Sequence, residues 1–242
     1  MSNVLATQHA DEEATYLFRL PSVPSVTVQD DSRLFPVNRI FCVGRNYADH
    51  AKEMGVEVDR EAPFYFTKPS SATVPSGAEI RYPPGTTNYH YEMEFVVALG
   101  ASAFEVTVEK ALDAVFGYAA GLDMTRRDLQ LEARAKGRPW DLGKAFEESA
   151  VMGEIVRREK FGELADQRIE LKVNGEVRQE AKLSDLVWSV PELVSHLSRY
   201  YHLQAGDLIY TGTPAGVGAV IGGDSLIGTI DGLPLVGLSI SK

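Results

Sequence analysis

Hydrophobic and polar positions from about residue 78 onward follow the short-period patterns of strands, which are either alternating or continuously apolar. Strands are predicted over the following ranges: 80–82, 91–99, 116–122, 168–173, 176–179, 208–211, 225–230 and 235–240. Asn174-Gly175 separates two of these strands and predicts a tight hairpin, because a type I′ turn needs positive φ at both central residues.

Helical segments are fewer and shorter than the strands. Three ranges have the composition of short helices: 45–55, 106–115 and 125–136. Ser189 and Glu192 have the spacing of a capping box and begin a further helix. That helix is predicted to carry on one side Leu193, Leu197 and Tyr200. Strands outnumber helices and do not alternate with them regularly, which favours an α+β, β-rich fold over a doubly wound sheet.

The chain divides into three segments by composition. Residues 1–15 are polar and acidic and are expected to form a flexible N-terminus. Residues 16–75 are repeatedly interrupted by proline and form an N-terminal segment. Residues 76–242 carry the strand pattern and are expected to form a β-rich catalytic domain.

The formal net charge of the 242 residues is −10, which argues against a nucleic-acid-binding protein because such proteins carry a basic excess. An anionic substrate would need a local cationic pocket or a bound metal.

Cys42 is the single cysteine, so no intrachain disulfide forms. With no signal-peptide pattern and no apolar run of membrane-spanning length, a cytoplasmic location and no membrane partner are expected.

Two glutamates stand out in the strand pattern at 91–99. Glu92 and Glu94 are two residues apart, so on a strand their side chains share one face with His90. Two carboxylates at this spacing offer oxygen ligands to a hard divalent cation such as Mg²⁺. A solvated polar face at the start of a strand explains the same pattern.

Asp123 ends an apolar, small-residue strand, and the predicted helix follows directly. A third carboxylate beside the two glutamates would complete a set of three oxygen ligands. Aspartate is also a good helix N-cap, so the sequence leaves both interpretations open.

A second polar pair lies in the predicted helix at 45–55. His50 and Glu53 are three residues apart and therefore share a face. A histidine oriented by a carboxylate is suited to act as a general base near neutral pH. An ordinary exposed polar pair has the same spacing.

Lys68 and Lys144 lie among apolar or small residues, where a lysine can stabilise an oxyanion or simply extend to solvent.

Residues 211–218 are rich in glycine but lack the lysine-serine ending of a phosphate-binding loop. A loop whose backbone amides and threonine hydroxyls meet a carboxylate is one interpretation, and a plain tight turn is the other.

Six sequence fragments together resemble the fumarylacetoacetate hydrolase family, in its order and with its spacing, between about Arg39 and Leu235. They are VGRNYADHAKEMG, PFYFTKPSSA, HYEMEFVVALG, GLDMTRRDLQ, GKAF and GDLIYTGTPAGVG. The resemblance implies a β-rich roll of mixed sheets, usually dimeric, so a homodimer is expected.

The resemblance also implies roles for individual residues. The three carboxylates of the family's metal site match Glu92, Glu94 and Asp123, with Mg²⁺ expected and Mn²⁺ or another divalent cation as alternatives. The catalytic residues match His50, Glu53 and Lys144. Substrate-binding positions are expected at Arg45, Lys68, Arg127, Gln130 and Thr213. The family's mobile lid matches residues 50–69.

The resemblance implies metal-dependent hydrolysis of the carbon–carbon bond of an acylpyruvate. The expected substrate is fumarylpyruvate, a small anionic oxo acid of gentisate-type aromatic catabolism. Its distal carboxylate needs a cationic partner, for which the candidates are Arg45, Arg126, Arg127 and Arg138. A decarboxylase or isomerase acting on a 2-oxo diacid such as oxaloacetate is the alternative on the same fold. A non-catalytic binding protein would not need the complete set of residues.

Overall fold

The computed structural model describes residues 16–53, 55 and 60–242. An eight-stranded sheet is the centre of the molecule, with strand order β4-β3-β15-β8-β9-β11-β5 and β12 paired to β9. Its strands are Phe64–Lys68 (β4), Ile40–Gly44 (β3), Leu208–Tyr210 (β15), Met93–Leu99 (β8), Val115–Asp123 (β9), Ala150–Met152 (β11), Thr73–Pro75 (β5) and Val156–Arg157 (β12). Parallel and antiparallel pairs are mixed, as β15 runs parallel to β3 and antiparallel to β8.

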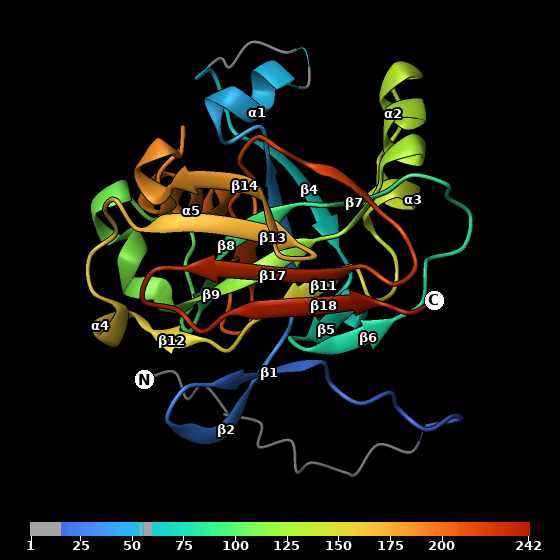
Figure 1. Cartoon of the computed structure of the whole chain (residues 1–242). Coiled ribbons are helices and arrows are strands. Elements are labelled where there is room, and N and C mark those ends of the chain that lie inside the picture. The colour runs from blue at the N-terminus through green and yellow to red at the C-terminus, as the bar shows by residue number, and fades with distance from the viewer. Residues whose placement is uncertain (1–15, 54, 56–59) are drawn as a thin grey trace, which may run out of the picture.

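A five-stranded sheet covers one face of the central sheet, in the order β14-β13-β17-β18-β6, and its strands cross the front of the view in Figure 1. These strands are Glu176–Lys182 (β14), Arg168–Val173 (β13), Ser225–Ile230 (β17), Val236–Ile240 (β18) and Ala78–Ile80 (β6). Asn174 and Gly175 join β13 to β14 with φ of 52° and 85°, so the predicted hairpin turn is confirmed.

Two smaller sheets complete the strands. One has the order β10-β7-β16, formed by Thr125–Arg126, Tyr89–Tyr91 and Gly218–Val220. The other is the hairpin of Ser25–Val28 (β1) and Asp31–Pro36 (β2). Figure 1 shows this hairpin at the end of the molecule opposite to α1 (Ala48–Glu53) and α2 (Arg127–Ala135). The remaining α-helices are Asp141–Lys144 (α3), Arg158–Phe161 (α4) and Val190–Ser198 (α5), with 3₁₀ turns at Ser70–Ala72, Val108–Ala114 and Leu183–Asp185.

Strand β8 is buried on both faces of the central sheet, which explains why its residues 95–99 form a continuous apolar run. Phe95 and Val97 pack into the core between the two large sheets, whereas Val96 and Ala98 pack into a second core on the opposite face. Met93 fills the space between the sheets against Gly228, where a Cβ atom would lie only 2.3 Å from the methionine sulfur.

The α+β, β-rich architecture is therefore confirmed, while several element boundaries differ from the prediction. The segment at 106–115 is a 3₁₀ helix over Val108–Ala114. Helix α5 has the predicted capping box, but it ends at Ser198, and Tyr200 is 69% exposed instead of packing with Leu193 and Leu197. The predicted strand at 91–99 is interrupted at Glu92, because the chain leaves the three-stranded sheet there and enters the central sheet.

The predicted segment boundary near residue 75 does not divide the sheets. Strands β3, β4 and β5 precede it and pair within the same sheet as β8, β9 and β15. Residues 64–68 of the predicted lid form β4, which is paired with β3, so this part of the stretch belongs to the sheet. Residues 1–15, 54 and 56–59, which include the predicted flexible N-terminus and part of the predicted lid, lie outside the described residues.

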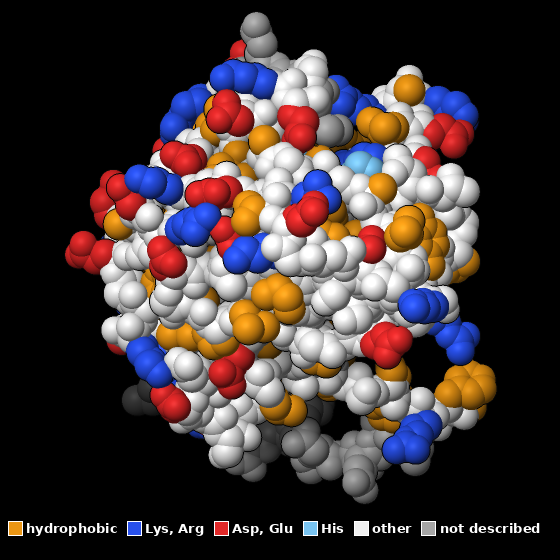
Figure 2. Space-filling model, viewed as in Figure 1, with side chains coloured by type: hydrophobic (Ala, Val, Ile, Leu, Met, Phe, Trp, Pro, Cys, Tyr) orange, Lys and Arg blue, Asp and Glu red, His pale blue; other side chains and the backbone are white. Residues whose placement is uncertain are grey.

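Charged side chains of both signs lie on the surface. On the face shown in Figure 2, acidic and basic side chains are interspersed over the region of β13 and β14, without a continuous basic patch in that view. Within the described part of the chain, no helix has the length and apolar character needed to cross a membrane.

Candidate active site

Three buried carboxylates converge where the chain passes into the central sheet. Glu92 lies between β7 and β8, Glu94 lies in β8, and Asp123 is the last residue of β9. The pairing of β8 with β9 sets Glu94 opposite Gly121, and the backbone N–H of Asp123 donates to the Glu92 carbonyl at 2.9 Å. One oxygen from each side chain lies within 4.8 Å of the other two. The convergence predicted from the sequence is confirmed.

The alternative interpretations of these carboxylates are wrong. Glu92, Glu94 and Asp123 are 5%, 1% and 0% exposed, so they do not form a solvated polar face. Asp123 does not cap α2, because Thr125 and Arg126 pair with β7 and the N-cap position falls on Arg126.

Lys144 lies among the carboxylates, and its side chain is 1% exposed. The ammonium donates to Glu92 Oε2, Asp123 Oδ2 and Thr125 Oγ1, each at 2.7 Å. Burial opposes the charged form, but Asp123 and Glu92 raise the pKa of Lys144 above its ordinary value. Lys144 is therefore a charged group inside the site and does not extend to solvent.

Lys68 lies behind Asp123 and has a fully buried side chain, with its ammonium nitrogen 2.9 Å from Asp123 Oδ1. It also donates to Ser149 Oγ at 2.9 Å and to the backbone carbonyls of Met124 and Lys144 at 3.1 Å and 2.5 Å. Burial lowers the pKa of Lys68. Its donors are directed at the protein and it does not line the cavity, so its contacts support Asp123. Its role as a substrate contact stays a prediction.

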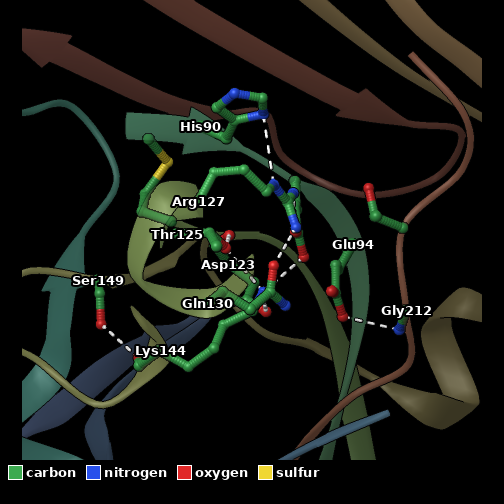
Figure 3. A network of polar contacts seen from close by, with 12 residues as sticks. His90, Glu94, Asp123, Thr125, Arg127, Gln130, Lys144, Ser149 and Gly212 are labelled. Atoms are coloured by element: carbon green, nitrogen blue, oxygen red, sulfur yellow. Dashed lines mark hydrogen bonds and ion pairs between the residues drawn. The ribbon is translucent and has the colours of Figure 1, made fainter. Parts of the chain in front are cut away.

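Arg127, at the start of α2, connects the carboxylates to a glutamine on the next turn of the helix (Figure 3). Its guanidinium donates to Glu92 Oε1 and to Gln130 Oε1. The Nε atom of Arg127 lies 3.5 Å from His90 Nδ1. Arg127 therefore orients Gln130 while neutralising Glu92.

The three carboxylates differ in their electrostatic surroundings. Burial opposes ionisation of Glu92, but Lys144 and Arg127 together hold its pKa well below the usual range. Burial, with Asp123 and Glu92 nearby, raises the pKa of Glu94 well above its ordinary value. Glu94 accepts a hydrogen bond from the Gly212 backbone N–H at 2.7 Å, and no lysine or arginine of the described residues forms an ion pair with it.

This donor set fits a divalent cation. The ionised form of a buried glutamate beside two further carboxylates is unfavourable unless a further positive charge lies nearby. Three carboxylate oxygens within 4.8 Å of one another are the kind of ligands that Mg²⁺ and Mn²⁺ take in proteins. The acidic group can therefore hold such an ion, with the remaining positions left for water or substrate.

The predicted histidine–glutamate pair also forms. His50 Nδ1 lies 3.1 Å from Glu53 Oε2 on α1, and His50 is only 7% exposed. Gly216 donates its backbone N–H to both Glu53 oxygens, at 3.1 Å and 3.2 Å. The pair is thus fixed by the glycine-rich loop and is not an ordinary exposed ion pair.

The glycine-rich loop meets two carboxylates of the protein itself. Gly212 and Gly216, with φ of 102° and 96°, direct their N–H groups to Glu94 and Glu53. Thr213 lines the cavity, and its hydroxyl accepts a hydrogen bond from the Gln179 amide at 2.8 Å. The expected meeting of loop amides with carboxylates is observed, but both carboxylates belong to this chain.

A cavity of about 40 Å³ lies over the carboxylates. Its lining includes eight of the predicted site residues: Arg45, His50, Glu92, Glu94, Arg127, Gln130, Lys144 and Thr213. Glu53, Lys68 and Asp123 lie behind this lining and hold residues that belong to it.

Sequence reasoning missed three supporting residues: Thr125, Ser149 and Gln179. Gln179 is buried and connects two segments, because it accepts from the Met93 N–H at 2.9 Å and donates to Thr213 and the Pro214 carbonyl at 2.8 Å. A polar residue in a strand with alternating polar neighbours gives no signal of this role, since its burial depends on sheet packing.

The family model for the C-terminal region of fumarylacetoacetate hydrolase matches residues 39–236. The chain belongs to this family. The match covers nearly the range over which the six sequence fragments suggested it, and the family's β-rich mixed-sheet fold agrees with the architecture in Figure 1.

Members of the fumarylacetoacetate hydrolase family with named functions are similar to this chain over most of its length. A fumarylpyruvate hydrolase from Ralstonia sp. is 53% identical over 190 residues, which cover 77% of this chain and 98% of that protein. The mitochondrial oxaloacetate tautomerase FAHD1 of Rattus norvegicus is 47% identical over 194 residues, covering 80% and 87%.

A solved structure of the family is also closely similar. The crystal structure of fumarylpyruvate hydrolase from Pseudomonas aeruginosa in complex with Mn²⁺ and pyruvate superposes with a TM-score of 0.90 at 47% identity. The superposition covers 94% of this chain and 99% of that one.

Proposed function

We propose that this protein is a divalent-metal-dependent hydrolase that cleaves fumarylpyruvate to fumarate and pyruvate. One observation carries the proposal: a histidine held by a glutamate, His50 and Glu53, lines the same cavity as the carboxylates Glu92 and Glu94. A general base and a cation-binding group are thus present at one reaction site. The similarity to two fumarylpyruvate hydrolases supports the choice of substrate.

The cation would be held by Glu92, Glu94 and Asp123, and we propose Mg²⁺ or Mn²⁺. When bound, it supplies Lewis-acid polarisation of the 2-oxo acid part of the substrate. The P. aeruginosa relative supports this assignment, because it was crystallised with Mn²⁺ and pyruvate.

His50 is proposed to activate the attacking water. A carboxylate only accepts hydrogen bonds, so Glu53 fixes the neutral imidazole with its proton on Nδ1 and leaves Nε2 free to accept a proton. Water gives that proton to Nε2 as its oxygen bonds to the carbonyl carbon of the acyl group. Gly216 keeps Glu53 in place through its backbone N–H.

The carbon–carbon bond then breaks, and its electron pair passes to the pyruvate part as an enolate. Lys144, whose ammonium lies in the cavity wall, stabilises that negative charge. The proton held at His50 Nε2 returns to the enolate carbon and gives pyruvate, while the acyl part leaves as fumarate. The new carboxyl group, which carries the second proton of the water, loses that proton to solvent as fumarate forms, so water and fumarylpyruvate account for all atoms of the products.

The decisive experiment is to incubate the metal-loaded protein with fumarylpyruvate and to couple pyruvate formation to lactate dehydrogenase. Equimolar fumarate and pyruvate, lost with a chelator and restored by Mg²⁺ or Mn²⁺, are the expected result. Consumption of fumarylpyruvate without pyruvate would contradict the proposal.

Tautomerisation of oxaloacetate is the second candidate, because the rat tautomerase is 47% identical to this chain. That reaction moves a proton between carbon and oxygen and releases no fragment. Following the enol and keto forms of oxaloacetate by ultraviolet absorption, in parallel with the pyruvate assay, separates the two reactions. Release of CO₂ from oxaloacetate would instead identify a decarboxylase.

Four further features belong to the proposal. We expect a homodimer, a cytoplasmic location and a place in gentisate-type aromatic catabolism. We also expect a lid within residues 50–69, the stretch to which the family resemblance assigns it. Size-exclusion chromatography with light scattering tests the homodimer directly.

A further inference from the structure

The cavity over the carboxylates is too small for the whole proposed substrate. Its volume is about 40 Å³, and a cavity needs roughly 10–15 Å³ for each water molecule that it holds. The pyruvate end can displace such waters, but an acyl group with its own carboxylate needs additional space.

A larger cavity of about 500 Å³ lies directly beside the first. The two cavities share five lining residues: Arg45, Phe66, Arg134, Trp140 and Lys144. The larger cavity lies between β4 and the segment that joins α2 to α3, and its lining continues to Phe64, Arg138 and Tyr201. The shared walls make it an extension of the reaction site; we refer to it below as the outer chamber.

We propose that the outer chamber receives the acyl arm of the substrate and that Arg45 binds the carboxylate at the end of that arm. This inference rests on the proposed hydrolase function and specifies its substrate class: acylpyruvates with a flat acyl group that ends in an anion.

The chamber walls suit a flat, conjugated group. The Trp140 ring lies 4.9 Å from the ring of Phe64 and 5.7 Å from that of Phe66, measured between centroids. Phe64 and Phe66 are two residues apart on β4 and therefore face the same side of the strand. An acyl arm that lies along the exposed side of these rings keeps its conjugated plane against aromatic faces, which favours an unsaturated chain over a bulky saturated one.

The charge of the chamber suits an anion, against the net −10 of the whole chain. Apart from Lys144, which is paired with Glu92 and Asp123, its lining carries Arg45, Arg134 and Arg138 but only one acidic residue, Asp141. This local excess of cations in an acidic protein is the cationic pocket that an anionic substrate requires.

Arg45 has the position to bind the distal carboxylate. It lines both cavities, and its guanidinium carbon lies 5.6 Å from the ring centroid of Phe64, which lines only the outer chamber. No carboxylate of the described residues forms an ion pair with Arg45. Its backbone has φ of 61°, a left-handed conformation that residues with a Cβ rarely adopt. That conformation fixes the direction in which the side chain leaves the end of β3.

The other arginine candidates are less suited. Arg127 is already bonded to Glu92 and Gln130. Arg126 lines neither cavity, and its guanidinium lies over the Phe146 ring at 4.1 Å. Arg138 lines only the outer chamber and not the cavity over the carboxylates.

The kinetic test compares two substrates on the Mn²⁺-loaded full chain: fumarylpyruvate and acetylpyruvate, which lacks the distal carboxylate. Arg45→Met should lower kcat/KM for fumarylpyruvate about 10- to 100-fold, the range of a lost charge-assisted hydrogen bond, and change it less than about threefold for acetylpyruvate. The matched control is Arg81→Met, an exposed arginine that lines neither cavity and should leave both values unchanged. An equal loss on both substrates would overturn the role of Arg45.

A binding test does not depend on hydrolysis. The chain has two tryptophans, so Trp188→Phe leaves Trp140 as the fluorescent reporter in the chamber wall. Fumarate should change this fluorescence. Crotonate, which has a methyl group in place of one carboxylate, should bind at least tenfold more weakly than fumarate. Arg45→Met should remove this preference for fumarate. If fumarate and crotonate bind equally to the parent protein, the proposal fails, whatever reaction the enzyme catalyses. If neither fumarylpyruvate nor acetylpyruvate is hydrolysed but fumarate still binds more tightly than crotonate, the proposed hydrolase function fails and the proposed role of Arg45 stands.

Discussion

The ammonium nitrogen of Lys144 lies 2.7 Å from Oδ2 of Asp123, inside the protein and away from solvent. This contact joins α3 to the end of β9 and makes the charge of the candidate metal site depend on a residue that is not one of its oxygen ligands.

Replacing Lys144 by methionine should separate metal binding from stability and turnover. Glu92 and Asp123 would lose a buried cation, so the metal-free protein should be destabilised by about 3 kcal/mol. A divalent cation should restore most of that loss, because it replaces the missing charge. Urea unfolding with and without Mn²⁺ measures both effects, while turnover of fumarylpyruvate should fall about 100-fold or more. A Lys144→Met protein whose urea midpoint does not respond to Mn²⁺ would argue against the electrostatic account.

Stability of the metal-free protein should fall as pH rises, because the pKa of Glu94 is raised in the folded state by burial and by Asp123 and Glu92. A carboxyl with a raised folded pKa binds its proton more tightly when folded, so this stabilisation is present at low pH. It is lost from the ordinary glutamate pKa upward to the raised one.

The gap between metal-free and Mn²⁺-loaded stability should therefore widen over that interval, and metal binding should release a proton. Titration calorimetry in buffers of different ionisation enthalpy measures the proton. Glu94→Gln should remove the slope in the metal-free protein, and a gap that stays constant with pH would refute the assignment.

His50→Ala should remove most turnover and leave metal affinity nearly unchanged. A general base contributes about 10²- to 10⁴-fold to a rate, and His50 forms its hydrogen bond with Glu53 instead of with the three metal-site carboxylates. Glu92→Ala is the contrasting variant and should abolish metal binding. Equilibrium dialysis with Mn²⁺ distinguishes the two. A His50→Ala protein that has lost its Mn²⁺ would place the histidine among the metal ligands.

Gly216→Ala should disturb the histidine–glutamate pair through the backbone. Gly216 has φ of 96°, and an added Cβ would lie 2.0 Å from the Arg178 carbonyl oxygen, so the loop must shift and weaken its bonds to Glu53. We expect a stability loss of about 2 kcal/mol or more, with reduced kcat.

Gly175→Ala is the matched control, because Gly175 has φ of 85° with nothing within 4 Å of an added Cβ. It should lose only about 1 kcal/mol, with kcat unchanged. Thermal unfolding and the pyruvate assay measure the pair. Similar kcat values in the two variants would remove the proposed link between loop and base.

Cys42 should resist alkylation in the native protein. It is fully buried in β3, and burial raises the pKa of its thiol well above the ordinary value, so little reactive thiolate forms. Iodoacetamide should label it only after unfolding in guanidinium, which mass spectrometry detects. Rapid labelling of the folded protein would show that this part of the central sheet opens.

Local signals in the sequence determined the elements whose causes lie within a few residues. Asn174 and Gly175 specify a turn through their own φ preferences, and Ser189 and Glu192 cap α5 within one helical turn. His50 and Glu53 meet for the same reason, since residues three apart on a helix are neighbours. The family's fragment order, read from the sequence alone, also identified the correct fold.

Tertiary structure alone decided which polar residues are buried and what charge surrounds them. From the sequence, Asp123 could be a helix cap as well as a metal ligand, and Lys68 and Lys144 could be solvated as well as buried. The pairing of β8, β9 and β11 in the folded chain packs them together and decides between these alternatives. Arg45 was one of several arginine candidates until packing placed it between two cavities. The reason is physical: pKa and binding depend on burial and on charges a few ångströms away, and those neighbours are distant in the chain.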